Sequence, residues 1–169
     1  MELIGVCGQF ELSDFDSCGV THLISIGDSD DDFGFIRFAA DDHLCLRFTD
    51  TSDPTHDDAP TAASLKPLLQ WAERVGDGQA LIHCAGGISR SPAVALLALC
   101  ATDPDTNPQN HMESVTAVAK LSYIWPNELV IEIGDDLLNR NGEIVAGVDR
   151  WRAEQGSIPN PFFDGRNSE

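Results

Sequence analysis

The chain has 169 residues, of which 42 % are hydrophobic and 22 % are charged. This size and composition are those of one globular domain with a buried core, and they exclude a disordered or membrane-spanning chain. Acidic residues outnumber basic ones by 28 to 10, and the formal net charge of -18 disfavours general binding to nucleic acid or anionic membranes. No basic stretch precedes an apolar block at the N-terminus, so we expect a single cytoplasmic domain over residues 1–169.

The first part of the chain alternates short apolar runs with polar stretches. Because short apolar runs between turn residues are typical of buried strands, three strands are expected: residues 3–7, 21–26 and 44–48. The stretches between and after them are acidic or rich in Asp, Thr and Pro, and are expected to be solvated turns and loops: residues 11–19, 28–32 and 49–60.

From Thr61 onward, helical spacing of apolar residues predominates. The expected helices are residues 61–75, 91–100, 109–121, 127–138 and 142–151. A fourth strand is expected at residues 79–84, so that a strand, a loop and a helix follow one another in mid-chain. This order of elements predicts an α/β fold with a central, mainly parallel sheet flanked by helices. Residues 141–169 are expected to form a C-terminal helical extension and a loosely held tail.

The strand–loop–helix unit carries the residues with chemical potential. The strand ends at Cys84, a glycine-containing turn follows, and the next helix begins at Ser91-Pro92. Amide groups of such a turn, together with the positive end of the helix, form a binding site for a phosphate-sized anion. Arg90 adds a planar guanidinium that can bind two phosphate oxygens. The same positive field favours the thiolate form of Cys84, which is the nucleophile that phosphoryl transfer needs.

This segment resembles the His-Cys-x5-Arg-Ser/Thr signature of cysteine-dependent protein tyrosine phosphatases, in their small dual-specificity-like branch. The matching segment is His83-Cys84-Ala85-Gly86-Gly87-Ile88-Ser89-Arg90-Ser91. One departure is Gly86, where the family commonly has Ala. The likeness covers about residues 1–140, and residues 141–169 look like a bacterial extension of the domain. The resemblance implies a phosphatase fold and hydrolysis of phosphotyrosine through a phosphocysteine intermediate, without metal or cofactor. Phosphoserine and phosphothreonine stay open as further substrates.

The resemblance also implies a role for each matching position. Cys84 resembles the nucleophile, Arg90 the residue that binds phosphate and stabilises the transition state, and Ser91 the hydroxyl that helps the thiolate leave. His83 resembles the residue that orients the loop and helps to keep the cysteine ionised. Asn127, in a stretch similar to the family's late helix, would help to hold the loop. The implied phosphate cradle consists of the backbone amides of Ala85, Gly86, Gly87, Ile88, Ser89 and Arg90.

A general acid is needed as well, because an alkoxide or phenoxide leaves poorly without a proton. In the family this residue is an Asp on a loop that follows a strand, roughly thirty residues before the cysteine. Asp50 lies 34 residues before Cys84, directly after the strand expected at 44–48, and is the favoured candidate. Asp53 lies 31 residues before Cys84 and stays open as the alternative.

Several other protein classes use a similar cysteine-containing loop or a phosphate-binding loop. Low-molecular-weight phosphatases and arsenate reductases carry a similar loop at the N-terminus, so its mid-chain position here disfavours both. A rhodanese-like sulfurtransferase or a non-catalytic phospho-binding module remain as alternatives. The expected partner is a phosphorylated protein or a small phosphomonoester, and the absence of Lys from residues 85–89 disfavours phosphoinositides. The histidines show no metal-ligand pattern. The oligomeric state, and any redox partnership of Cys84 with Cys7 or Cys45, stay open.

Overall fold

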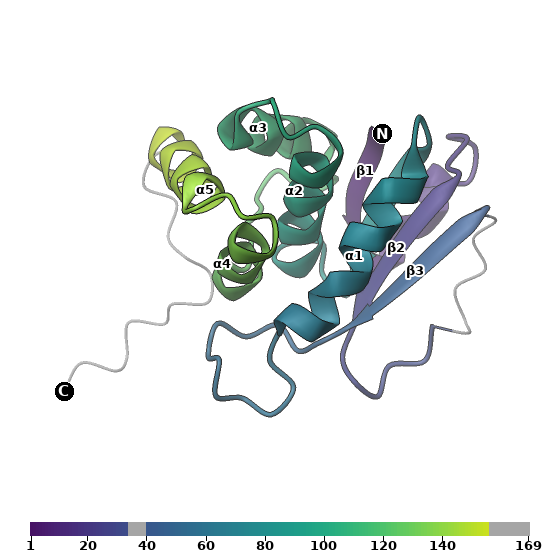
Figure 1. The fold of residues 1–169 in the computed structure, drawn as a ribbon. Coiled ribbons are helices and arrows are strands. Elements are labelled where there is room, and N and C mark those ends of the chain that lie inside the picture. Colours follow the sequence, from purple (N-terminus) through teal and green to yellow (C-terminus); the bar gives the residue numbers. More distant parts are fainter. Residues whose placement is uncertain (34–39, 156–169) are drawn as a thin grey trace.

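A computed structural model describes residues 1–33 and 40–155 of the chain. Four strands form one sheet: β1 (Glu2–Gly8), β2 (His22–Gly27), β3 (Asp42–Arg47) and β4 (Gln79–Cys84). The sheet order is β1-β4-β2-β3, and each neighbouring pair is parallel. Figure 1 shows helix α1 (Ala62–Val75) lying over one face of this sheet. The predicted α/β class with a mainly parallel sheet is confirmed. Strand β4 lies inside the sheet, where its last residue, Cys84, is paired with Gly8 of β1.

The predicted helices are also confirmed, with bounds shifted by a few residues. They are α1 (Ala62–Val75), α2 (Arg90–Thr102), α3 (Pro108–Val118), α4 (Glu128–Leu137) and α5 (Glu143–Glu154). A short 3-10 helix, η1 (Gln9–Phe15), occupies part of the region where turns were expected. The tail expected after α5 falls on residues 156–169, which lie outside the described residues.

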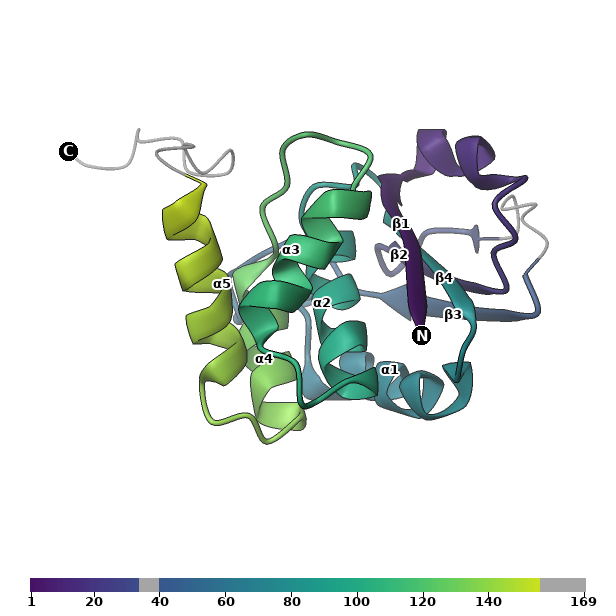
Figure 2. The same cartoon turned by 90° about the horizontal axis from the view of Figure 1, so that it is seen from above.

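The two faces of the sheet are covered differently. Side chains alternate between faces along a strand, so Ile24 and Ile82 pack under the α-helices, whereas their chain neighbours Leu23 and Leu81 pack with Phe15 of η1. Helices α1, α2 and α3 contact the strands. Helices α4 and α5 pack outside them, and α5 is the helix farthest from the sheet (Figure 2).

Helix α2 occupies the centre of the molecule. Every residue from Arg90 to Cys100 is buried, because the helix contacts α1, α3, α4, β1 and β4. This agrees with a sequence that is apolar on nearly every helical face. Since α2 follows β4 after a short loop, its N-terminus lies at the carboxyl edge of the sheet, where parallel α/β folds place their ligand sites.

A buried carboxylate fixes the start of α5. Asp135 of α4 is 3 % exposed and accepts hydrogen bonds from the backbone N–H of Gly142 at 2.6 Å and of Ile144 at 2.7 Å. These amides belong to the first turn of α5, where backbone donors have no partner inside the helix and where negative charge is favourable. Asp135 therefore ties the outermost helix to α4.

Replacement of Asp135 should destabilise the fold. We expect Asp135→Ala to lower the free energy of unfolding by about 1.5–3 kcal/mol, because the buried amides would lose a charged acceptor. Urea unfolding of the variant and the parent measures this difference. Asp136→Ala, at the exposed neighbouring position, is the control and should change the free energy by less than about 0.5 kcal/mol. Equal effects of the two substitutions would contradict the capping role.

Candidate active site

The thiol of Cys84 lies at the base of the loop that joins β4 to α2. It is 2 % exposed, and two donors converge on its sulfur. The backbone N–H of Gly87 donates to Sγ at 3.2 Å, and the hydroxyl of Ser91 lies 3.3 Å from Sγ. Both groups can donate to a thiolate, and the positive end of α2 begins beside it at Arg90. The loop can therefore stabilise negative charge on Cys84.

The loop packs closely against β1 at Gly87, where only glycine fits, but leaves open space around Gly86. Gly87 has a φ of +73°, and a Cβ there would lie 2.5 Å from the backbone nitrogen of Gly8 and 2.7 Å from the carbonyl carbon of Cys7. A side chain at position 87 would thus be strained and would displace β1. A Cβ at Gly86 would meet nothing within 4 Å. The Gly86 departure from the family pattern is therefore compatible with the loop.

Arg90 is buried with part of its guanidinium unused. It is 5 % exposed, and its NH1 donates to Oδ1 of Asp28 and to the carbonyl oxygen of Phe48, both at 3.0 Å. Its Nε is buried and has no hydrogen-bond partner among the described residues. The contacts of NH1 position the guanidinium, and its Nε is a donor that these contacts do not use. The expected solvated loop at residues 28–32 also has a structural contact, because the carboxylate of Asp28, on a side chain that is 47 % exposed, pairs with the buried Arg90.

Asp50 is brought to the loop between β4 and α2, whereas Asp53 is not. The carboxylate Oδ1 of Asp50 accepts hydrogen bonds from the hydroxyl of Ser89 at 2.6 Å and from Nδ2 of Asn127 at 2.8 Å. Asp53 is exposed and accepts from the backbone and the hydroxyl of Thr55 within its own turn. These bonds from Thr55 hold the pKa of Asp53 below its usual value, which disfavours a protonated acid there.

The segment before α4 holds the loop from outside. The backbone N–H of Trp125 donates to the carbonyl oxygen of Ile88 at 2.7 Å, and that of Asn127 donates to the carbonyl oxygen of Ser89 at 3.2 Å. Asn127 thus contacts both the loop, through its backbone, and Asp50, through its side chain. The contribution of Trp125 was missed in the sequence, because a contact made by a backbone N–H leaves no signal in the residue type.

His83 is buried behind the loop, at the inner end of a chain of hydrogen bonds that reaches the exposed His43. Its Nε2 is 2.6 Å from the hydroxyl oxygen of Ser25, which is also 2.8 Å from Nε2 of His43. Burial lowers the pKa of His83 to about 4, so its ring is neutral near pH 7. A neutral ring can orient the end of β4 but adds no positive charge beside Cys84. The sequence analysis did not find Ser25 and His43 as its partners.

Several other features concern cysteines, metals and membranes. All five cysteines are free. Burial raises the pKa of the Cys7 thiol to about 12. Partial desolvation raises the pKa of the Cys45 thiol above its usual value, although this residue is exposed overall. Within residues 1–33 and 40–155, no group of three or more His, Cys, Asp or Glu side chains could hold a metal ion. None of the described helices is long and apolar enough to cross a membrane.

The low pKa of His83 should make stability fall in acid. Between the ordinary value of 6.5 and about 4, the unfolded chain binds a proton that the folded chain does not. The contribution of the neutral ring is therefore complete above pH 6.5 and is lost as the pH falls towards 4. We expect His83→Gln to reduce the loss of unfolding free energy in this range by up to about 3 kcal/mol. Urea unfolding at several pH values measures the slope.

Exposed His56 provides the matched control for this experiment. His56→Gln should leave the dependence of stability on pH as it is in the parent chain. An unchanged slope in the His83→Gln variant would show that the buried ring does not couple folding to protonation.

Comparisons with known proteins identify the fold of the chain. No protein-family model and no curated protein sequence matches the chain. A variant of human DUSP28 is similar in structure, with 20 % identity, a TM-score of 0.56, and coverage of 82 % of this chain and 89 % of that one. The human tyrosine phosphatase-like serine/threonine/tyrosine-interacting protein has 18 % identity, a TM-score of 0.55, and coverage of 80 % and 87 %.

A mouse putative dual specificity phosphatase, solved with zinc tungstate, is a third similar structure. It shares 20 % identity with this chain at a TM-score of 0.54, over 80 % of this chain and 79 % of its own length. The solved structures that resemble this chain include dual-specificity phosphatases, and the likeness extends over about four fifths of this chain in each case. The chain therefore has the fold of the dual-specificity phosphatases.

Proposed function

We propose that the chain is a cysteine-dependent phosphatase that hydrolyses phosphotyrosine through a phosphocysteine intermediate. One observation carries the proposal. Residues 85–89, here called the phosphate loop, join a buried thiol that lies between two hydrogen-bond donors to a buried arginine at the start of α2, whose Nε lacks a partner among the described residues. A thiolate, helix-terminal amides and a guanidinium are the groups that bind a tetrahedral dianion and attack it.

In the first step, the amides of residues 85–90 and the Nε side of Arg90 bind the phosphate oxygens. The Cys84 thiolate attacks phosphorus, the bond from phosphorus to the ester oxygen breaks, and Asp50 gives its proton to the departing oxygen. The hydrogen bonds from Ser89 and Asn127 converge on Oδ1 of Asp50. Oδ2 is therefore the atom that carries the transferable proton.

In the second step, water attacks the phosphocysteine. Asp50, now a carboxylate, accepts a proton from the water, the bond between sulfur and phosphorus breaks, and inorganic phosphate is released. The Ser91 hydroxyl, 3.3 Å from Sγ, donates to the thiolate as charge returns to it. Gly87 donates to the same sulfur through its backbone N–H. The thiolate is then ready for another turnover.

The open rim of the loop supports a phosphorylated protein or a small phosphomonoester as substrate. Ala85 and Gly86 are exposed, and neither has a side chain that would narrow the entrance. Phosphotyrosine is the preferred substrate because a phenol is a better leaving group than the alcohols of serine and threonine. Residues 85–89 contain no Lys that would bind the further phosphates of a phosphoinositide.

Each of the two alternatives differs from a phosphatase in one feature. A sulfurtransferase has no need of a general acid, so the bonds that hold Asp50 to Ser89 and Asn127 favour phosphate ester hydrolysis. A non-catalytic module would bind phosphorylated partners without turnover. The structural likeness to a phosphatase-like interacting protein is the observation that favours this alternative. Both are distinguished by assays of aryl phosphate hydrolysis and of thiosulfate turnover.

Removal of the nucleophile should separate binding from catalysis. We expect Cys84→Ser to reduce hydrolysis of an aryl phosphate to background, because a serine hydroxyl is not ionised near pH 7. Tungstate binding, measured by calorimetry, should persist because the loop amides and Arg90 remain. Cys18→Ser, at an exposed position outside the loop, is the control and should keep full activity. Hydrolysis by Cys84→Ser at a rate near that of the parent would exclude the phosphocysteine mechanism.

Loss of the general acid should depend on the leaving group. We expect Asp50→Ala to lower kcat for a phosphotyrosine peptide by roughly 10²–10⁴. The effect should be much smaller for an aryl phosphate with a very acidic phenol, which leaves without a proton. Asp53→Ala is the matched control, three residues along the same loop. A large effect at Asp53 and none at Asp50 would assign the acid to Asp53 instead.

A further inference from the structure

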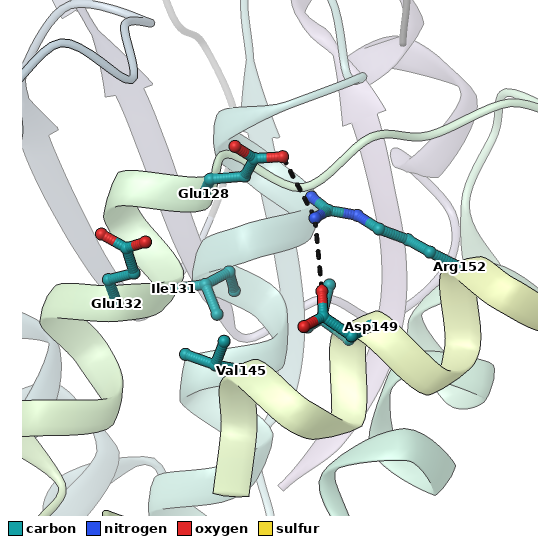
Figure 3. Close-up of a pocket in the computed structure, with 7 residues that line it drawn as sticks. Glu128, Ile131, Glu132, Val145, Asp149 and Arg152 are labelled. Carbon is teal, nitrogen blue, oxygen red and sulfur yellow. Dashed lines mark hydrogen bonds and ion pairs between the residues drawn. The ribbon is translucent and has the colours of Figure 1, made fainter. Parts of the chain in front are cut away.

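One side chain of α5 holds the segment before α4, at a cavity of about 250 Å³ between these two helices (Figure 3). NH1 of Arg152 lies 3.1 Å from Oε1 of Glu128 and 3.8 Å from Oδ1 of Asp149. Its NH2 donates to the carbonyl oxygen of Pro126 at 2.9 Å, and its guanidinium carbon lies 4.6 Å from the centre of the Trp125 ring. The Arg152 side chain is 18 % exposed, whereas the side chains of Glu128 and Asp149 are 46 % and 66 % exposed. The hydrogen bond to Pro126 is therefore better shielded from water than the two ion pairs.

The residues that Arg152 holds belong to the segment that holds the candidate active site. Trp125 donates its backbone N–H to Ile88 of the phosphate loop, and Asn127 donates its backbone N–H to Ser89. Asn127 also donates from Nδ2 to the carboxylate of Asp50. Residues 125–128, which we call the bracing segment, therefore have α5 on one side and the phosphate loop and Asp50 on the other.

We propose that Arg152 is a positioning residue, which fixes the bracing segment and through it the placement of Asp50 against the phosphate loop. The proposal rests on the proposed function, because Asp50 is the acid whose placement matters. The contacts of Arg152 are with Trp125, Pro126 and Glu128 of the bracing segment and with Asp149 of its own helix, so it acts on the site through the bracing segment. On this view the C-terminal helix α5 supports the active site through the bracing segment.

The chemistry of these contacts requires arginine. A guanidinium is planar and has donors on several edges, so it can pair with Glu128, donate to Pro126 and stack on Trp125 at the same time. A lysine ammonium could keep the ion pair with Glu128 but has no plane to stack. Arg152→Lys should therefore restore only part of the effect of removing the side chain.

Leaving-group dependence is the readout that distinguishes positioning from stability alone. We expect Arg152→Ala to lower kcat at least about tenfold for a phosphotyrosine peptide, since displacement of a catalytic group by about 1 Å has effects of this order. KM should change little, because the loop amides and Arg90 remain. For an aryl phosphate with a very acidic phenol, kcat should stay within about twofold of the parent, because that reaction does not need the proton. Arg152→Lys should lie between Arg152→Ala and the parent.

Arg150→Ala is the matched control on the same helix. Arg150 is exposed, and its Nε donates to Gln109 rather than to the bracing segment. The control should leave kcat for both substrates unchanged. Equal losses of Arg152→Ala on both substrates, or the same loss in Arg150→Ala, would overturn the proposal. Should Arg152→Ala fail to fold, Arg152→Lys gives the same comparison with a smaller expected difference.

Hydrogen exchange tests the contact without relying on turnover. The amides of Trp125 and Asn127 donate to the phosphate loop, so their exchange should quicken in Arg152→Ala and not in Arg150→Ala. Unchanged exchange at both amides would overturn the positioning role. Failure of the proposed function is seen differently, as a lack of phosphomonoester hydrolysis by the parent chain itself.

Discussion

Arg90 places a positive charge, almost out of water, at the positive end of α2. The helix has no acidic residue in its first turn, and the guanidinium is 5 % exposed. A buried cation is costly unless a partner neutralises it, and the helix dipole adds to that cost. Asp28 offers one carboxylate oxygen from a side chain that is 47 % exposed, and Phe48 offers a carbonyl oxygen. The guanidinium is thus only partly compensated by the described residues, and the phosphate of the proposed function would complete the compensation.

The loop that presents Arg90 is held on two sides by backbone contacts. Gly87 lies directly against the backbone of β1, and Trp125 and Asn127 donate to the carbonyl oxygens of Ile88 and Ser89. Ser89 is where structure and chemistry meet, because its carbonyl oxygen accepts from Asn127 while its hydroxyl donates to Asp50. The loop and Asp50 are therefore connected through Ser89. Under the proposed function, Ser89 and Asn127 together hold the general acid against the loop.

The sequence was informative where structure depends on neighbours along the chain. Apolar spacing identified the four strands and five α-helices, and the contiguous segment 83–91 identified the loop, because its thiol, glycines and guanidinium follow one another. The strand order and η1 were not predicted, since both depend on packing between distant segments. The ion pair between Asp28 and Arg90 was not predicted for the same reason. The two residues are 62 positions apart, and nothing in an acidic run distinguishes the one carboxylate that pairs with a distant arginine.

The two candidate acids illustrate the same limit. Asp50 and Asp53 both lie at a suitable distance before Cys84, and the sequence favoured Asp50 only for its place after a strand. The structure separates them by their hydrogen-bond partners, since Asp50 is bonded to Ser89 and Asn127 whereas Asp53 is bonded within its own turn. The contact that joins Asp50 to Asn127 spans 77 residues. Only the fold brings them together, so spacing alone leaves the acid undecided.

Under the proposed function, the net charge of the chain makes phosphate binding depend on close contacts. With a formal charge of -18, the molecule as a whole repels a phosphate dianion. Salt screens that repulsion beyond a Debye length of about 8 Å at physiological ionic strength. Hydrogen bonds at contact distance are screened far less. Attraction must therefore come from amides and a guanidinium that are already in place when the phosphate arrives. The glycine at position 87, the carboxylate of Asp28 and the bracing segment each fix one part of that arrangement, and so offset at short range what the surface charge opposes at long range.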